Sequence, residues 1–229
     1  FMLFILLCLM SSSAGAAEIE RALSGDTLIL TDGLTLKLEG IRASTDQARE
    51  GLHNLTAHQV IDIRHATTDR YGRTTGQVYI TAKTIWLQEE MLKSGLAFVF
   101  PPTGSESNIA DMLRIESSAR RDHKGIWGDP AYADIPADQA ITHVGAFAFV
   151  TGTVTKVDDA KDATHLNFGD DWRKDFTITI AAHDRHFFRK ARIDMSDYEG
   201  KKIRVRGIVK HNFGGMIEVT HPAQIEILR

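Results

Sequence analysis

Leucines alternate with other residues from Leu28 to Leu38, and this pattern constrains the fold more than any other in the chain. A period of two puts successive side chains on opposite faces of a β-strand. The alternation is interrupted at Thr31-Asp32-Gly33, and an Asp-Gly turn between two alternating runs predicts a β-hairpin. The first half of the chain is therefore expected to be built on antiparallel strands.

Three stretches of the first half have helical rather than alternating spacing. They cover residues 48–57, 86–94 and 109–124. Gly95 follows the second stretch, at the position where a glycine commonly ends a helix. We therefore expect residues 18–130 to form one domain in which helices pack on a predominant β-structure.

Strand-like patterns return in the last third of the chain, after a segment of small and polar residues. Residues 129–143 contain two prolines, and we place a linker at residues 131–144. The strands expected beyond it cover residues 150–157, 166–168, 176–180, 203–209 and 216–220. Five strands with a short segment between the third and fourth are typical of an OB-like β-barrel, which we predict for residues 145–229. The expected fold class is α+β, mainly β.

The composition excludes several classes of protein. Hydrophobic residues make up 43% of the 229-residue chain and charged residues 25%, the usual balance of a globular protein. The formal net charge is −3, so no overall basic field points to a nucleic-acid partner. Because Cys8 is the only cysteine, neither a disulfide framework nor a cysteine–zinc site is expected.

An unbroken apolar run extends from Phe1 to Met10, and small residues follow it as far as Ala17. This run is too short for a hydrocarbon core, which needs about 20 residues. It matches the apolar region of a secretory signal, with Ala14-Gly15-Ala16 as the cleavage site, and a buried strand is the alternative. Residues 1–17 are therefore predicted to be a signal peptide, which implies a periplasmic or secreted protein without a stable membrane span.

Four groups of motifs occur in order along the first half. They are Ser24-Gly25-Asp26-Thr27-Leu28, Leu36-Lys37-Leu38-Glu39-Gly40-Ile41, Asp69-Arg70-Tyr71-Gly72-Arg73, and Gly95-Leu96-Ala97 with Glu116, Ala119-Arg120 and Gly125-Ile126-Trp127. In this order and spacing they resemble the staphylococcal-nuclease (thermonuclease) family. The resemblance implies an OB-type barrel with helices packed on it, and an enzyme that cuts DNA and RNA phosphodiesters with a calcium ion.

The resemblance also implies roles for individual residues. Asp26 matches a calcium-binding carboxylate, and Arg73 matches an arginine that contacts the phosphate on the leaving-group side. Lys37 stands where the family has its other arginine, which keeps the charge but loses the planar pair of donors. Tyr71 lies in the same motif as Arg73 and is a candidate for nucleic-acid contact.

Two acidic positions of the family site are occupied here by other residues. Arg42 replaces the second calcium carboxylate, and Thr45 replaces the glutamate that positions the attacking water. A single carboxylate does not make a useful calcium site, because this ion takes about six to eight oxygen ligands. Calcium is therefore expected only if a neighbouring acid, Asp46 or Glu39, supplies the missing oxygens.

The position of Arg42 suggests what takes the place of the ion. A buried charge is costly unless it is paired, so we expect the guanidinium of Arg42 to pair with Asp26. The alternative is an Arg42 side chain that points into solvent, which a loop position allows.

The second half contains aromatic and basic residues of the types with which OB barrels bind single strands. The candidates are Trp172, Arg173, Arg204 and Arg206. Alternating arginines also occur on any solvated strand face, however, and Trp172 could instead anchor the barrel end or a domain interface. The partners that these residues suggest are single-stranded nucleic acid or another protein.

Two functions are consistent with these observations. In the first, the chain is an exported nuclease-like protein with a degraded catalytic site that binds nucleic acid or protein, and it needs no cofactor. In the second, it is an active calcium-dependent phosphodiesterase with a rearranged site. We favour the first because Arg42 and Thr45 occupy two acidic site positions.

Overall fold

The computed structural model describes residues 17–69, 71–101, 108–171 and 173–228. The first half contains β1 (Ala17–Ser24), β2 (Thr27–Leu30), β3 (Thr35–Leu38), β4 (Ile41–Arg42), α1 (Asp46–Thr56), β5 (Val60–Thr68), β6 (Thr74–Ile80), β7 (Ile85–Trp86), α2 (Leu87–Lys93), β8 (Phe98–Val99) and α3 (Ile109–Arg121). The hairpin expected from the leucine alternation is β2–β3, in which Leu28 pairs with Leu36. The predicted signal segment lies outside the described residues except for Ala17, which begins β1.

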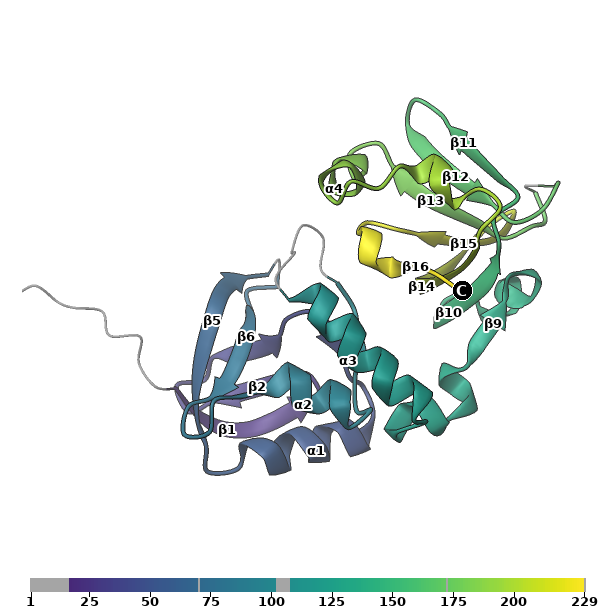
Figure 1. The fold of residues 1–229 in the computed structure, drawn as a ribbon. Coiled ribbons are helices and arrows are strands. Elements are labelled where there is room, and N and C mark those ends of the chain that lie inside the picture. Colours follow the sequence, from purple (N-terminus) through teal and green to yellow (C-terminus); the bar gives the residue numbers. More distant parts are fainter. Residues whose placement is uncertain (1–16, 70, 102–107, 172, 229) are drawn as a thin grey trace, which may run out of the picture.

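The strands of the first half close into a barrel (Figure 1). Strands β1, β2 and β3 form an antiparallel meander. After α1, β5 returns antiparallel to β1, and β6 pairs antiparallel with β5 and parallel with β3. The leucines at the even positions of β2 and β3 point inward and are buried, which explains why alternation predicted these strands.

The second half repeats this arrangement of strands. The first half ends with η1 (Gly125–Gly128), and η2 (Pro130–Tyr132) follows it. The second half contains β9 (Asp134–Pro136), η3 (Ala137–His143), β10 (Phe147–Thr153), β11 (Lys156–Asp159), β12 (Ala163–Asn167), β13 (Thr177–Ala181), α4 (Arg185–Lys190), η4 (Met195–Tyr198), β14 (Lys202–Asn212), β15 (Gly214–Glu218), η5 (Pro222–Gln224) and β16 (Ile225–Ile227). Strand β13 is parallel to β15, and β10 is antiparallel to β14. Both halves thus have OB topology, and the chain has the predicted mainly β, α+β fold.

The first strand expected in the second barrel, residues 150–157, is divided at Val154 and Thr155. Strand β10 pairs with β14 on one side, whereas β11 pairs with β12 on the other. A strand that changes partners in this way allows the sheet to curl and close. Alternation located the strand, but the bend depends on partners that are distant in sequence.

Part of the segment predicted as a linker belongs to the second sheet. Strand β9 pairs parallel with β10, with Ile135 opposite Val150, and Ala140 in η3 is fully buried in the second core. The small residues and prolines suggested a loop, but an edge strand accepts proline because one of its sides makes no ladder bonds. The second barrel therefore includes residues 134–143 in addition to the predicted 145–229.

Each barrel has its own hydrophobic core, and a third cluster joins them. The second core contains Val150, Leu166, Phe176, Ile178, Val205 and Val219, as the alternation predicted, with Phe168 packed against it. The joining cluster combines Phe98, Ala119, Ile126 and Trp127 of the first half with Phe149 of β10. No helix within the described residues is long and apolar enough to cross a membrane.

Candidate functional site

Asp26 lies in the turn between β1 and β2, with a side chain that is almost completely buried. One carboxylate oxygen, Oδ1, accepts hydrogen bonds from the hydroxyls of Ser24 and Thr27, both at 2.9 Å. The other, Oδ2, lies 2.7 Å from Nζ of Lys37 and accepts a bond from the backbone N–H of Ala43 at 3.3 Å. A carboxylate has about four acceptor positions, so the hydrogen-bonding capacity of Asp26 is filled by the protein itself.

The local sequence explains how these groups meet. Thr27 and Lys37 are paired across β2 and β3, so their side chains lie on the same face next to Asp26. Gly25 allows α1 to approach the turn, because a Cβ atom there would lie 2.5 Å from Cβ of Ala48 and 2.8 Å from Cβ of Ala43. Only glycine fits between the turn and the helix.

Arg73 and Tyr71 lie in the turn between β5 and β6, and β6 is the strand next to β3, which carries Lys37. Lys37 is in register with Thr75 of β6, and alternation places Arg73 on the same side of the sheet as Lys37. The guanidinium of Arg73 pairs with Asp69 at 2.7 Å and lies 5.2 Å from the ring centre of Tyr71, an exposed residue. Partial desolvation of the Asp69 carboxylate raises its pKa. The hydrogen bonds from Arg73 and from the backbone of Tyr71 outweigh this effect and hold the pKa of Asp69 below its usual value.

Arg42 does not pair with Asp26, and this expectation is wrong. Residues alternate in β4, so buried Ile41 points into the core and Arg42 points away from it. The Arg42 guanidinium lies 5.3 Å from the ring centre of Phe100. Lys37 occupies the position next to Asp26 that we had expected Arg42 to take, because its strand is paired with β2.

Thr45 has a structural role in place of the glutamate role of the family. It is the N-cap of α1, and its hydroxyl accepts a hydrogen bond from the backbone N–H of Ala48 at 3.1 Å. Such a cap satisfies one of the N–H groups that have no partner within the helix.

Replacing this cap should have a measurable cost. We expect Thr45→Ala to lower the free energy of unfolding by about 1 kcal/mol, because one backbone N–H of α1 loses its acceptor. Ser44→Ala is the control, since Ser44 is the exposed preceding residue. Equal losses from the two substitutions in chemical denaturation would show that the Thr45 hydroxyl does not act as a cap.

The residues present do not fit a calcium ion. Asp46 is almost fully exposed and pairs with Arg49 at 3.5 Å, while Glu39 accepts a hydrogen bond from Gln77 at 3.4 Å. Among the described residues, neither acid shares a hydrogen-bond or ion-pair partner with Asp26. Within the described residues, no three His, Cys, Asp or Glu side chains are placed to hold a metal ion together.

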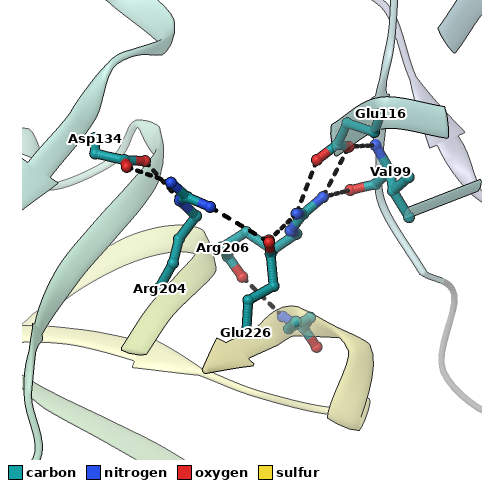
Figure 2. A network of polar contacts seen from close by, with 7 residues as sticks. Val99, Glu116, Asp134, Arg204, Arg206 and Glu226 are labelled. Carbon is teal, nitrogen blue, oxygen red and sulfur yellow. Dashed lines mark hydrogen bonds and ion pairs between the residues drawn. The ribbon is translucent and has the colours of Figure 1, made fainter. Parts of the chain in front are cut away.

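The structure gives Arg204 and Arg206 a role other than nucleic-acid contact. Arg206 is only 1% exposed, and its guanidinium reaches from β14 into the first half, as Figure 2 shows. It pairs with Glu116 of α3 at 2.8 Å, donates to the carbonyl of Val99 at 3.1 Å and pairs with Glu226. Arg204 is bound to Asp134 and Glu226 beside it. Arg206 therefore links the two barrels, whereas the partners of Arg204 both belong to the second barrel.

The other candidates of the second half lie away from this network. Arg173 is an exposed residue of the β12–β13 loop, where its backbone N–H donates to Asp171 at 3.1 Å. Trp172 lies outside the described residues. This backbone contact of Arg173 lies within the β12–β13 loop, whereas the side-chain contacts of Arg204 and Arg206 lie in the buried network, so these contacts among the described residues do not place the three arginines together.

The sequence analysis did not predict the buried network, although the position of Glu116 in α3 indicates it. Glu116 is 2% exposed and lies on the same helix face as Met112, Ile115 and Ala119. A carboxylate on the apolar face of a helix requires a buried cationic partner. Burial opposes ionisation of Glu226, yet the charge of Arg206 holds the pKa of Glu226 below its usual value.

Comparisons with known proteins agree with the architecture of the first half. A family model described as "Staphylococcal nuclease homologue" matches residues 40–129. "Micrococcal nuclease" of Shigella flexneri is 31% identical over 129 residues, which cover 49% of this chain and 74% of that protein. "Protein ParB" of Escherichia coli is 27% identical over 129 residues, with 49% of this chain and 72% of the relative covered. Through its first barrel, the chain therefore belongs to the family of staphylococcal nuclease homologues.

Proposed function

We propose that the protein binds single-stranded nucleic acid through its first barrel and does not cleave it by the calcium-dependent reaction of its family. The observation that carries this proposal is the saturated carboxylate of Asp26, whose Oδ2 lies 2.7 Å from Nζ of Lys37. A divalent ion would have to displace this ammonium group. It would gain no second carboxylate, because Arg42 and Thr45 stand at the two acidic positions.

Two cationic groups remain suited to a phosphate. An ammonium group has three donors, and one of those of Lys37 is used by Asp26. The Lys37 side chain is 27% exposed and that of Arg73 is 35% exposed, so both reach the surface. Exposed Tyr71 lies beside Arg73 and offers a ring on which a base can stack. These groups support backbone binding without a metal.

The proposal predicts how binding depends on the medium. A labelled oligothymidylate should bind the full chain with an affinity that falls as salt rises, because phosphate contacts release counterions. The affinity in calcium should equal that in chelator, and the oligonucleotide should stay intact in both. Fluorescence anisotropy measures the affinity, and a denaturing gel detects cleavage. Calcium-dependent cleavage by the wild type would instead support the active phosphodiesterase.

Substitutions identify the groups involved. Lys37→Gln and Arg73→Gln should each weaken binding about tenfold, which is the effect of losing one charge-assisted hydrogen bond of about 1.5 kcal/mol. Lys83→Gln is the control, because Lys83 is an exposed lysine in the turn before β7. Arg73→Gln separates binding from stability, since its partner Asp69 lies in an exposed turn rather than in the core. Equal binding by all three variants would contradict the proposal.

A further inference from the structure

A cavity of about 530 Å³ lies on the second barrel, far in sequence from the site around Asp26. Its lining comes from β11, β12 and β13, the loop after β12, and Asn212 at the end of β14. This size lies within the range of about 300–1,000 Å³ that is typical of small-molecule sites. In OB folds, the face of the second and third strands, with the flanking loops, is a common binding surface. Strands β12 and β13 hold these positions here.

Strand register explains why this face is polar. Leu166, Ile178 and Ile217 point into the core, so the residues that alternate with them face outward. The pairings align these outward residues in two rows. One row contains Asp158, His165 and Thr179, and the other contains Lys156, Asn167 and Thr177.

The side chains of these rows hold one another in place. The amide nitrogen of Asn167 donates to Asp158 at 2.9 Å, and its oxygen accepts from the hydroxyl of Thr177 at 3.3 Å. Nδ1 of His165 lies 3.2 Å from the hydroxyl of Thr179. Such a network presents donors and acceptors in fixed directions, unlike the mobile lysines and glutamates of an ordinary solvated face.

The charges of the cavity argue against an anionic ligand. Asp158 and Asp170 line it, and Lys156 is the only lysine or arginine among its described lining residues. Lys156 is paired with Asp158, so its charge is already compensated. A phosphate backbone would meet a surplus of negative charge. Amide, imidazole, hydroxyl and carboxylate groups together suit the vicinal hydroxyls of a neutral sugar.

An aromatic residue follows the lining residue Asn212. Phe213 at the tip of the β14–β15 hairpin is 61% exposed and has a φ of 61°, a conformation that is costly for a bulky side chain. The hairpin tip is fixed against the β12–β13 loop, because a Cβ on Gly214 would lie 2.3 Å from the carbonyl oxygen of Asp175. Strained residues that the fold holds in place concentrate at functional sites.

We propose that this cavity is a binding site for a neutral saccharide, whose hydroxyls bond to the rows of polar side chains on β12 and β13. The site is independent of the nucleic-acid contacts proposed for the first barrel. Thr177 and Thr179 contribute hydroxyl groups to the lining of the cavity. Valine can replace either threonine, because it has the same shape and a high strand propensity but lacks the hydroxyl.

The test uses the full chain with cellohexaose, maltohexaose and N-acetylchitohexaose, all of them neutral, as probes in titrations followed by NMR. At least one probe should bind and shift the signals of His165 and Asn167. Thr177→Val and Thr179→Val should each weaken that binding at least tenfold. The control Thr153→Val changes an exposed threonine of β10 that does not line the cavity, and it should leave the affinity unchanged.

Two results would overturn the inference. One is the absence of any shift at His165 and Asn167 with all three probes. The other is binding of oligothymidylate that Thr177→Val weakens, because the cavity would then accept a nucleic acid. Oligothymidylate binding by Lys37→Gln tests only the site proposed on the first barrel. Either proposal can therefore be contradicted without affecting the other. Thermal melting confirms that each variant is folded.

Discussion

Arg206→Met should lower the free energy of unfolding by about 3–5 kcal/mol, the largest effect expected for any single substitution in this chain. The substitution leaves the carboxylate of Glu116, which is 2% exposed, without its cationic partner. It also removes the donor to the carbonyl of Val99, in the segment where the two halves meet (Figure 2). Chemical denaturation of the full chain measures the loss.

A second variant separates the stability lost by leaving a buried charge unpaired from the stability lost with side-chain packing. Glu116→Gln combined with Arg206→Met removes both charges, and it keeps an oxygen to accept the bond from the N–H of Val99. This double variant should lose less stability than the two single substitutions together, because no unpaired charge remains. Arg49→Met is the control for a surface pair and should change stability by less than about 0.5 kcal/mol. Additive losses from Glu116→Gln and Arg206→Met would contradict the role of the pair.

The network also determines the surroundings of Arg120. Its guanidinium lies 4.2 Å from the ring centre of Trp127 and 4.3 Å from that of Phe149, so it contacts aromatic rings from both halves. Burial, together with the nearby charge of Arg204, lowers the pKa of Arg120 to about 10. The interface therefore consists of a buried ion network within an aromatic cluster, which argues for a fixed arrangement of the two barrels.

The second large effect is expected from restoring the lost acids. Arg42→Asp together with Thr45→Glu should produce a calcium-dependent rise in Tm of about 10 °C, whereas wild type should show none. Calcium needs several oxygen ligands, and the double variant adds two carboxylates to the segment around Ala43, whose backbone N–H donates to Asp26, while it removes a guanidinium. Saturating calcium can then compete with Lys37 for Asp26. Thermal melting in calcium and in chelator measures the difference.

The control variant for this experiment has the same change in net charge, but at positions away from Asp26. Arg49→Asp with Gln47→Glu alters net charge by the same amount on exposed positions of α1. This control should show no calcium-dependent rise, because its acids do not face Asp26. Without calcium, the Arg42→Asp, Thr45→Glu variant should melt below wild type, since α1 loses the Thr45 cap. A calcium-dependent rise in wild type would show that the native site holds the ion.

Local patterns predicted most of the secondary structure. Alternation located the β2–β3 hairpin and the main strands of the second barrel, because each of those strands has one face in a core. Helical spacing followed by Gly95 predicted α2, and the glycine has the expected left-handed φ of 65°. Alternation and helical spacing depend on neighbours in sequence, so the sequence alone was sufficient for them.

The motifs identified Asp26 and Lys37 as site positions, but they did not predict that these two side chains pair with each other. Lys37 was identified as a phosphate contact, and the structure shows in addition that it pairs with Asp26. Arg42 was expected in that position, but the alternation of β4 turns it toward Phe100. The pairing depends on the register of β2 against β3 and of β4 against β8, which motif order does not specify.

By itself, the sequence determined the two barrels, the family of the first one and the loss of two acidic positions. The tertiary structure alone decided that Arg206 is buried against Glu116, 90 positions away along the chain. It also decided that polar residues from four strands line one cavity. The physical reason is that alternation assigns a side chain to one face of a strand, whereas only long-range packing determines whether that face meets water, a ligand or another domain.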